Sequence, residues 1–408
     1  MSLGASAEFG PQPSLRAPPK WKLLAGVYPD YFAGRYQYAW AEFLANRYDS
    51  ALEAVQAATA PQEPLRNVAY ELIGRIHLAQ ERYPAALAAL KQAEAIGQFG
   101  PSRRHAAALA AVRRFGESEK ILAALPAQSM ASGGLTNQFE RIAVPLDQGK
   151  WIEARRVAKH TATVASQSNP LLKHPFRLVD LLVRSLHDPA RFPLDELEAL
   201  ALSAMRDAAQ PDSADRDDLS VVALAAVRLS QRSGSSDVAT RVLPRLAPFV
   251  TANANPAALK LLVVVQAEQL RLAGKRGKSI ENLRELMDGS EPYQAHVALR
   301  DSLRAEGRDA EALRENRWLA AHRGRAYSDP AGGQVFQAMN VADTTLAHLD
   351  AAELLLRMGR KGEARLEAEA FRRAWPEKVL PDYLRRRLDA TLPASKQNTT
   401  VWVPAEVR

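Results

Sequence analysis

Cysteine is absent from the 408 residues of this chain. Its absence excludes disulfide scaffolds, iron–sulfur clusters, thiolate zinc sites and cysteine nucleophiles. Long apolar runs are absent as well, since none approaches the roughly 18 residues that a membrane-spanning helix needs. Met1 to Pro19 lack the apolar core of a signal peptide. We therefore expect a soluble chain, cytoplasmic by default, with the periplasm left open if a signal or an anchor was removed.

Catalytic motifs are lacking too. The segment from Gly274 to Ser279 resembles a phosphate-binding loop, but such a loop needs a glycine where this chain has Leu272. The eight histidines include no pair four residues apart, as a helical metal site would need. The nucleophile motif G-x-S-x-G is also missing. We predict that the chain is not an enzyme and holds no metal and no cofactor.

Charge of one sign is only slightly in excess, with 54 Lys and Arg against 46 Asp and Glu. The densest basic runs are Arg372-Arg373 and Arg385 to Arg387, and the second run stands between Asp382 and Asp389. Neither run has interleaved aromatic residues of the kind that stack on bases. Two interpretations stay open, solvated helix faces and contact with the phosphates of a nucleic acid.

Two stretches of the sequence, 35–58 and 70–93, align on each other without gaps at a period of 35 residues. Each pattern predicts a helix, a tight turn and a second helix. Small residues such as Gly74, Ala51 and Ala86 stand where the two helices must approach closely. Such hairpins cannot bury both faces alone, so they stack on one another.

The second stretch resembles the tetratricopeptide repeat, whose signature of about 34 residues runs W-x2-L-G-x2-Y, then A-x3-F and a closing proline. The signature positions are occupied by Tyr70, Ile73, Gly74, His77, Ala86 and Leu90. The resemblance implies an all-α fold, a right-handed superhelical solenoid of helix hairpins.

The same frame recurs in weaker form at 114–122, 148–158, 306–313 and 351–376. Between these stretches, 170–300 is helical by pattern and predicts diverged hairpins with turns at Ser233-Gly234 and Gly274-Lys275. The predicted organisation is a disordered leader or linker at 1–20, N-terminal repeats with a cap at 21–125, diverged hairpins at 137–325, a C-terminal hairpin and capping helix at 334–390, and an extended tail at 391–408.

The resemblance also implies a binding surface, because the first helix of each hairpin lines the concave side of such a solenoid. That face carries Tyr36, Trp40 and Phe43 in the first hairpin and Glu71 and Arg75 in the second. Aromatic residues and arginine are the usual anchors of protein interfaces. We predict that these five residues bind a peptide or a protein partner.

Aromatic residues are concentrated between residues 21 and 48, which allows a second interpretation. A terminal repeat must cover its open end. Trp21, Tyr28, Tyr31 and Phe32 would then form a capping segment. Capping and partner binding both stay open for this region.

The function predicted from the sequence is a non-catalytic scaffold or adaptor for protein–protein interaction, which also suits the sensor region of a larger bacterial-type signalling protein. One alternative is a nucleic-acid-binding regulator that uses the basic C-terminal helices. Another is an enzyme whose cleft is concealed in the diverged middle of the chain. No membrane insertion is expected, and the oligomeric state is not indicated.

Overall fold

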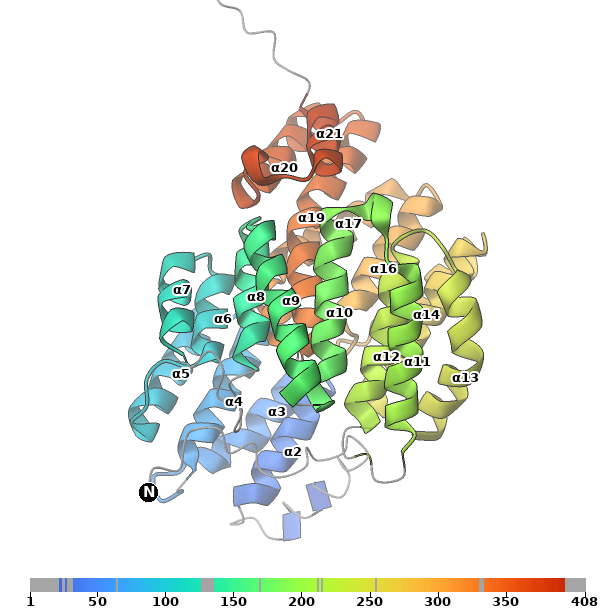
Figure 1. Cartoon of the computed structure of the whole chain (residues 1–408). Helices are drawn as coiled ribbons and strands as arrows, with labels where there is room; N and C mark the ends of the chain where they lie inside the picture. Colours follow the sequence, from blue (N-terminus) through green and yellow to red (C-terminus); the bar gives the residue numbers. More distant parts are fainter. Residues whose placement is uncertain are drawn as a thin grey trace, which may run out of the picture.

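The computed structural model of this chain describes residues 22–23, 26–27, 32–63, 65–125, 136–168, 170–210, 213, 216–253, 255–329 and 334–392. Within these ranges every regular element is a helix (Figure 1), which confirms the all-α prediction. The predicted leader at 1–20 and most of the predicted tail lie outside the described residues. No described helix is long and apolar enough to cross a membrane. The compartment stays a prediction.

Most helices pair with the next one along the chain. Seven hairpins are joined by three-residue turns: α2 (Phe32–Leu44) with α3 (Tyr48–Gln56), α4 (Arg66–Ala79) with α5 (Tyr83–Gly97), α6 (Arg103–Ala111) with α7 (Phe115–Ala124), α8 (Asn137–Asp147) with α9 (Trp151–Ser168), α14 (Pro256–Leu272) with α15 (Arg276–Arg284), α16 (Tyr293–Ala305) with α17 (Asp309–Ala321), and α19 (Val335–Arg357) with α20 (Lys361–Ala374).

Outside these hairpins the structure further describes α10 (Pro170–His187), α11 (Leu194–Ala208), α12 (Arg216–Gln231), α13 (Asp237–Asn253), α18 (Arg323–Ser328) and α21 (Asp382–Thr391). Short 3-10 helices cover Ala57–Thr59, Pro189–Arg191 and Glu377–Val379. The turns predicted at Gly234 and Gly274 are confirmed, because each glycine has a positive φ between two helices.

All seven of these hairpin turns have the same backbone conformation and the same hydrogen bond. The middle residue of each turn is left-handed: Asn46, Glu81, Arg113, Gly149, Gly274, Gly307 and Gly359. The N–H of the following residue donates to the carbonyl five positions earlier, as from Arg82 to His77 at 2.9 Å. That pairing satisfies carbonyls that the end of a helix leaves without partners. The donating residue is Arg or Lys in every one of the seven turns, which places a cation at the negative end of the preceding helix.

Small residues allow the two helices of a hairpin to approach. The fourth residue after the basic turn residue is alanine or serine and is fully buried in all seven hairpins: Ala51, Ala86, Ser118, Ala154, Ser279, Ala312 and Ala364. On the facing helix, a Cβ added at Gly74 would lie 2.6 Å from Cγ of Leu90. The predicted role of Gly74, Ala51 and Ala86 is therefore confirmed.

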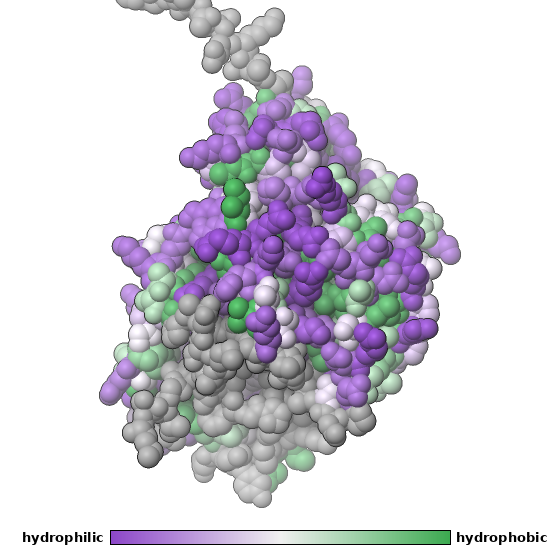
Figure 2. Space-filling view, viewed as in Figure 1, coloured by the Kyte–Doolittle hydropathy of each residue, from purple (hydrophilic) through white to green (hydrophobic). Residues whose placement is uncertain are grey.

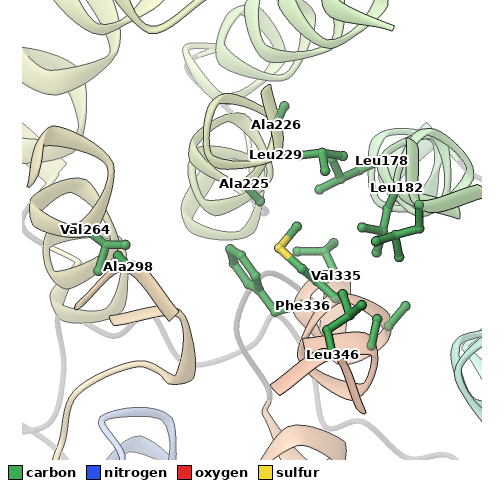
Figure 3. Packing of buried hydrophobic residues seen from close by; sticks show 14 of the residues in the cluster. Leu178, Leu182, Ala225, Ala226, Leu229, Val264, Ala298, Val335, Phe336 and Leu346 are labelled. Carbon is green, nitrogen blue, oxygen red and sulfur yellow. The ribbon is translucent and has the colours of Figure 1, made fainter. Parts of the chain in front are cut away.

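Helix α19 runs through the interior of the array (Figure 1). It packs against α8, α10, α12, α16, α17, α20 and α21. Its apolar residues lie on several faces, which is typical of a helix buried all round. Figure 3 shows Val335, Phe336 and Leu346 of α19 among Leu178 and Leu182 of α10 and Ala225, Ala226 and Leu229 of α12.

This arrangement restricts the open groove that the sequence predicted. The hairpins are present, but their interior is filled by α19, and the short helix α18 packs on α4 and α6. Contacts therefore cross the predicted domain boundaries, as where Arg232 binds Asp343 at 2.7 Å. The division into 21–125, 137–325 and 334–390 stays a prediction.

Candidate partner-binding site

The five residues predicted to bind a partner lie on neighbouring helices. Tyr36, Trp40 and Phe43 form a ladder on α2, with ring centroids 6.5 and 5.7 Å apart. The guanidinium of Arg75 on α4 lies 4.5 Å from the Trp40 ring centroid and 4.9 Å from that of Phe43. Glu71 stands one turn before Arg75 on the same helix. The structure thus assembles these side chains on the adjoining surfaces of α2 and α4.

The five residues differ in what they expose. Phe43 is fully buried and Arg75 keeps only 6% of its surface, so both act mainly inside the chain. Tyr36, Trp40 and Glu71 are half-buried. A partner could therefore touch these three side chains, while Phe43 and Arg75 hold the Trp40 ring in place.

Of the predicted capping residues, only Phe32 lies within the described part of the chain, as the first residue of α2. Phe32 stacks on Tyr36 with ring centroids 5.8 Å apart, which extends the aromatic ladder toward the start of α2. Trp21, Tyr28 and Tyr31 lie outside the described residues. Capping by the whole segment stays a prediction.

A cluster of arginines continues this surface onto α6 and α8. The carboxylate of Glu140, which is fully buried, lies 3.3 Å from Arg103 and 3.5 Å from Arg104. Arg104 also lies 3.8 Å from Glu71. Burial, together with the nearby charges of Arg103 and Arg75, lowers the pKa of Arg104 well below its usual value. The side chains of Trp40 on α2, Arg75 on α4 and Arg104 on α6 thus form a continuous strip. Its residues are aromatic on α2 and charged on α6.

This arginine cluster was not predicted from the sequence, although the repeat frame contains a signal for one of its members. Arg103 occupies the position in α6 that Tyr36 and Glu71 occupy in α2 and α4, ten residues before the left-handed turn residue in each case. Glu140 has no counterpart in the well-matched repeats, and its ion pairs join residues on different hairpins. The repeat period is therefore sufficient to predict the position of Arg103, but it does not predict that Glu140 pairs with it.

Beyond this strip, α18 covers the ends of the inner helices. Its first residue, Arg323, binds the carboxylate of Asp147 at 2.5 Å and the carbonyl of Ala111 at 3.1 Å. The hydroxyl of Tyr327 donates to the same carboxylate at 2.8 Å. Burial and that carboxylate raise the pKa of Tyr327 well above its usual value. This part of the inner face is thus occupied by the chain itself.

The basic C-terminal runs form several ion pairs. Arg387 binds Asp350 at 2.6 Å and Glu353 at 2.7 Å, which ties α21 to α19. Arg385 pairs with Asp382 at 3.1 Å. Binding of nucleic acid by this region stays a prediction. Since Arg385 and Arg387 are already paired with carboxylates, fewer positive charges are left for phosphates than the basic runs alone indicate.

The histidines are not gathered into a metal site. Among the described residues, no group of three or more histidine, aspartate and glutamate side chains is placed to hold a metal ion. Burial lowers the pKa of His77, which occupies a packing position of the second hairpin.

Comparisons with known proteins give little further information. No family model matches the sequence, and no curated protein matches it. The chain is similar to a solved structure titled "Crystal Structure of P58(IPK) TPR Domain at 2.5 A", with 14% identity over 94% of this chain and 95% of that chain, at a TM-score of 0.25. The helices and turns described above define the fold. In its repeat signature and its array of helix hairpins, the chain resembles the tetratricopeptide-repeat proteins.

Proposed function

We propose that this chain is a non-catalytic scaffold or adaptor that binds a peptide or protein partner on the surface where α2 adjoins α4. The observation that carries the proposal is the cluster of Trp40, Phe43 and Arg75, in which the guanidinium lies 4.5 and 4.9 Å from the two ring centroids and the two rings are tilted against each other. Binding energy at protein interfaces is concentrated in a few aromatic and arginine side chains of this kind.

The contacts with Phe43 and Arg75 restrain the Trp40 ring before a partner binds. A ring held by two neighbours has little rotamer freedom left to lose when a partner arrives, which lowers the entropic cost of association. Tyr36 continues the aromatic surface on one side, and Glu71 offers a carboxylate at its edge. A partner with an apolar anchor and a hydrogen-bond donor or a cation beside it would complement these three residues.

The position of α18 and α19 supports a site at this end of the array. Farther along, the inner helices α8, α12 and α16 pack on α19. The partner-binding surface proposed for the concave side is therefore short and centred on α2 and α4. The same proposal includes a role as the sensor region of a larger signalling protein.

The experiment compares proteins captured by the intact chain and by its variants, with quantitative mass spectrometry. Tyr36→Ala and Glu71→Gln change half-buried residues of the proposed surface, and Glu53→Gln on the exposed side of α3 is the matched control. Partners retained by the control and lost by both site variants are expected. A set of partners that neither site variant changes would contradict the proposed surface.

A further inference from the structure

A cleft of about 460 Å³ opens between α7, α8 and α9, away from the surface on α2 and α4. Its volume lies within the range of ligand pockets, roughly 300–1,000 Å³. Helix α8 contacts both neighbours, and α9, with 18 residues, is much longer than α7, with 10. Among the described helices, the short α7 thus covers only part of the side of α9 that it faces.

The floor of the cleft is apolar. Leu122 of α7, Val144 of α8 and Val157 of α9 line it. Pro145, which also lines it, has no N–H to offer. The surface around α9 and α10 is largely hydrophilic in Figure 2, so this apolar floor differs from its surroundings. An apolar side chain entering the cleft would be removed from water.

Two arginines of the lining have no carboxylate within ion-pair distance in the described part of the chain. The guanidinium of Arg141 donates to the carbonyls of Leu122 and Leu125 at 2.6 and 2.7 Å, so it is held in place without being neutralised. Burial lowers the pKa of Arg141. Arg156 is exposed at the rim, one turn after Glu153 on α9.

The other charges of the lining are balanced among themselves or face solvent. Lys150 pairs with Glu119, which also accepts a hydrogen bond from Gln148 at 2.8 Å. Glu153 is exposed at the rim. Next to the cleft, the outer side of α9 adds Arg155 and Lys159, both exposed. The field over the cleft is therefore positive, which attracts anionic groups.

From this geometry we infer that the cleft is a second docking site, which takes a partner segment that carries an apolar side chain beside aspartate or glutamate. The apolar side chain would contact the floor, and the carboxylates would lie against Arg141 and Arg156. Charge complementarity favours an acidic segment over a basic one. The inference rests on the proposed function and names a partner chemistry for a surface away from α2 and α4.

The test pans a random peptide library against the full chain and measures the affinity of enriched peptides by fluorescence anisotropy. Enriched sequences are expected to combine acidic with apolar residues. Arg156→Glu is expected to weaken their binding by about tenfold or more, because it reverses a charge that faces the ligand. Arg206→Glu on α11 is the matched control, since it makes the same charge reversal at an exposed arginine that does not line the cleft.

Several results would overturn the inference. Enriched peptides that are basic or uncharged would do so, as would acidic peptides whose affinity Arg156→Glu leaves unchanged. Peptides that instead lose affinity with Tyr36→Ala would exclude the cleft and leave the proposed function standing. Decanoate, a small carboxylic acid with an apolar chain, is tested in the same way. If no peptide is enriched and decanoate binds to the intact chain but not to Arg156→Glu, the cleft takes small acids and not a protein segment.

Discussion

The carboxylate of Glu81 accepts a hydrogen bond from the backbone N–H of Gly324 at 2.9 Å, across 243 residues of sequence. Its other oxygen accepts from the N–H of Arg325 at 3.0 Å. A turn residue of the second hairpin thereby caps the start of α18, whose first N–H groups have no partner within the helix. The N-terminal hairpins and the C-terminal part of the chain are fastened together at this point.

Gly324→Ala should destabilise the fold. A Cβ at this position would overlap the backbone oxygen of Leu78, and a backbone atom cannot move aside as a flexible side chain can. We expect a loss of about 1–3 kcal/mol in the free energy of unfolding, measured by chemical denaturation. Gly362→Ala on α20 is the control, because nothing lies within 4 Å of its added Cβ. Equal stabilities for the two variants would mean that α18 does not pack on α4 as described.

Gly307→Ala should destabilise the fold for a different reason. Gly307 has open space around it, but its φ of +76° is one that residues with a Cβ rarely adopt. The expected cost is about 1–2 kcal/mol, the strain of a left-handed residue. Comparing the midpoint of thermal unfolding of this variant with that of Gly362→Ala isolates the effect of the backbone conformation. Equal midpoints would argue against the left-handed turn.

Asp350 should make stability depend on pH in the acid range. Burial alone would raise its pKa, but the surrounding guanidinium groups of Arg300, Arg387 and Arg304 lower it to about 2. Because the pKa in the unfolded chain is about 4, the carboxylate contributes stability that is complete above that pH and is lost as the pH falls toward 2. Denaturation curves across this range should show the loss.

Asp350→Asn tests the same residue. The variant should lose stability at neutral pH, by about 3 kcal/mol, because it removes a buried carboxylate that Arg300, Arg304 and Arg387 share. It should also flatten the acid dependence. Asp382→Asn, whose side chain is 79% exposed in its ion pair with Arg385, should cost less than about 1 kcal/mol. An unchanged acid profile in Asp350→Asn would show that other carboxylates cause the dependence.

Arg228→Met should be tolerated although Arg228 is fully buried. Its three guanidinium nitrogens have no hydrogen-bond partner, and its nearest carboxylate oxygen, on Glu268, is 3.5 Å away. Arg271 binds Glu268 at 2.7 Å and would still neutralise it. Asp301, 3.7 Å from Arg228, likewise keeps its ion pair with Arg300, so the substitution leaves no buried carboxylate without an arginine, which is the condition under which replacing buried charges is often neutral. We expect a change of less than about 1 kcal/mol in chemical denaturation, and a loss above about 3 kcal/mol would show that Arg228 is well paired in solution.

The sequence was sufficient to predict what is local. The hairpin turns at Gly274, Gly307 and Gly359 follow from the pattern, because each turn and the helices that it joins lie within one repeat. The contact between Trp40 and Arg75 was also accessible, since the repeat period aligns α2 with α4.

What joins distant repeats was not predictable. The sequence around Ala351 and Leu355 indicates a hairpin helix, and nothing in it shows that the helix extends back to Val335 and enters the array. The contact between Glu81 and Gly324 depends on how hairpins far apart in the chain meet, and the cleft lined by Arg141 depends on how two consecutive hairpins pack on each other. A pattern within one repeat carries no information about such contacts.

Because the hairpins close around α19, we expect partners to bind outside the filled interior. Hydrogen–deuterium exchange measures this directly, because buried helices exchange only when the fold opens. The backbone amides of α19 between Val341 and Leu355 should be among the slowest to exchange, with those of Gly324 and Arg325 also protected. Rapid exchange across α18 and α19, with slow exchange in α4 and α5, would show that the array is open and that α19 does not fill its interior.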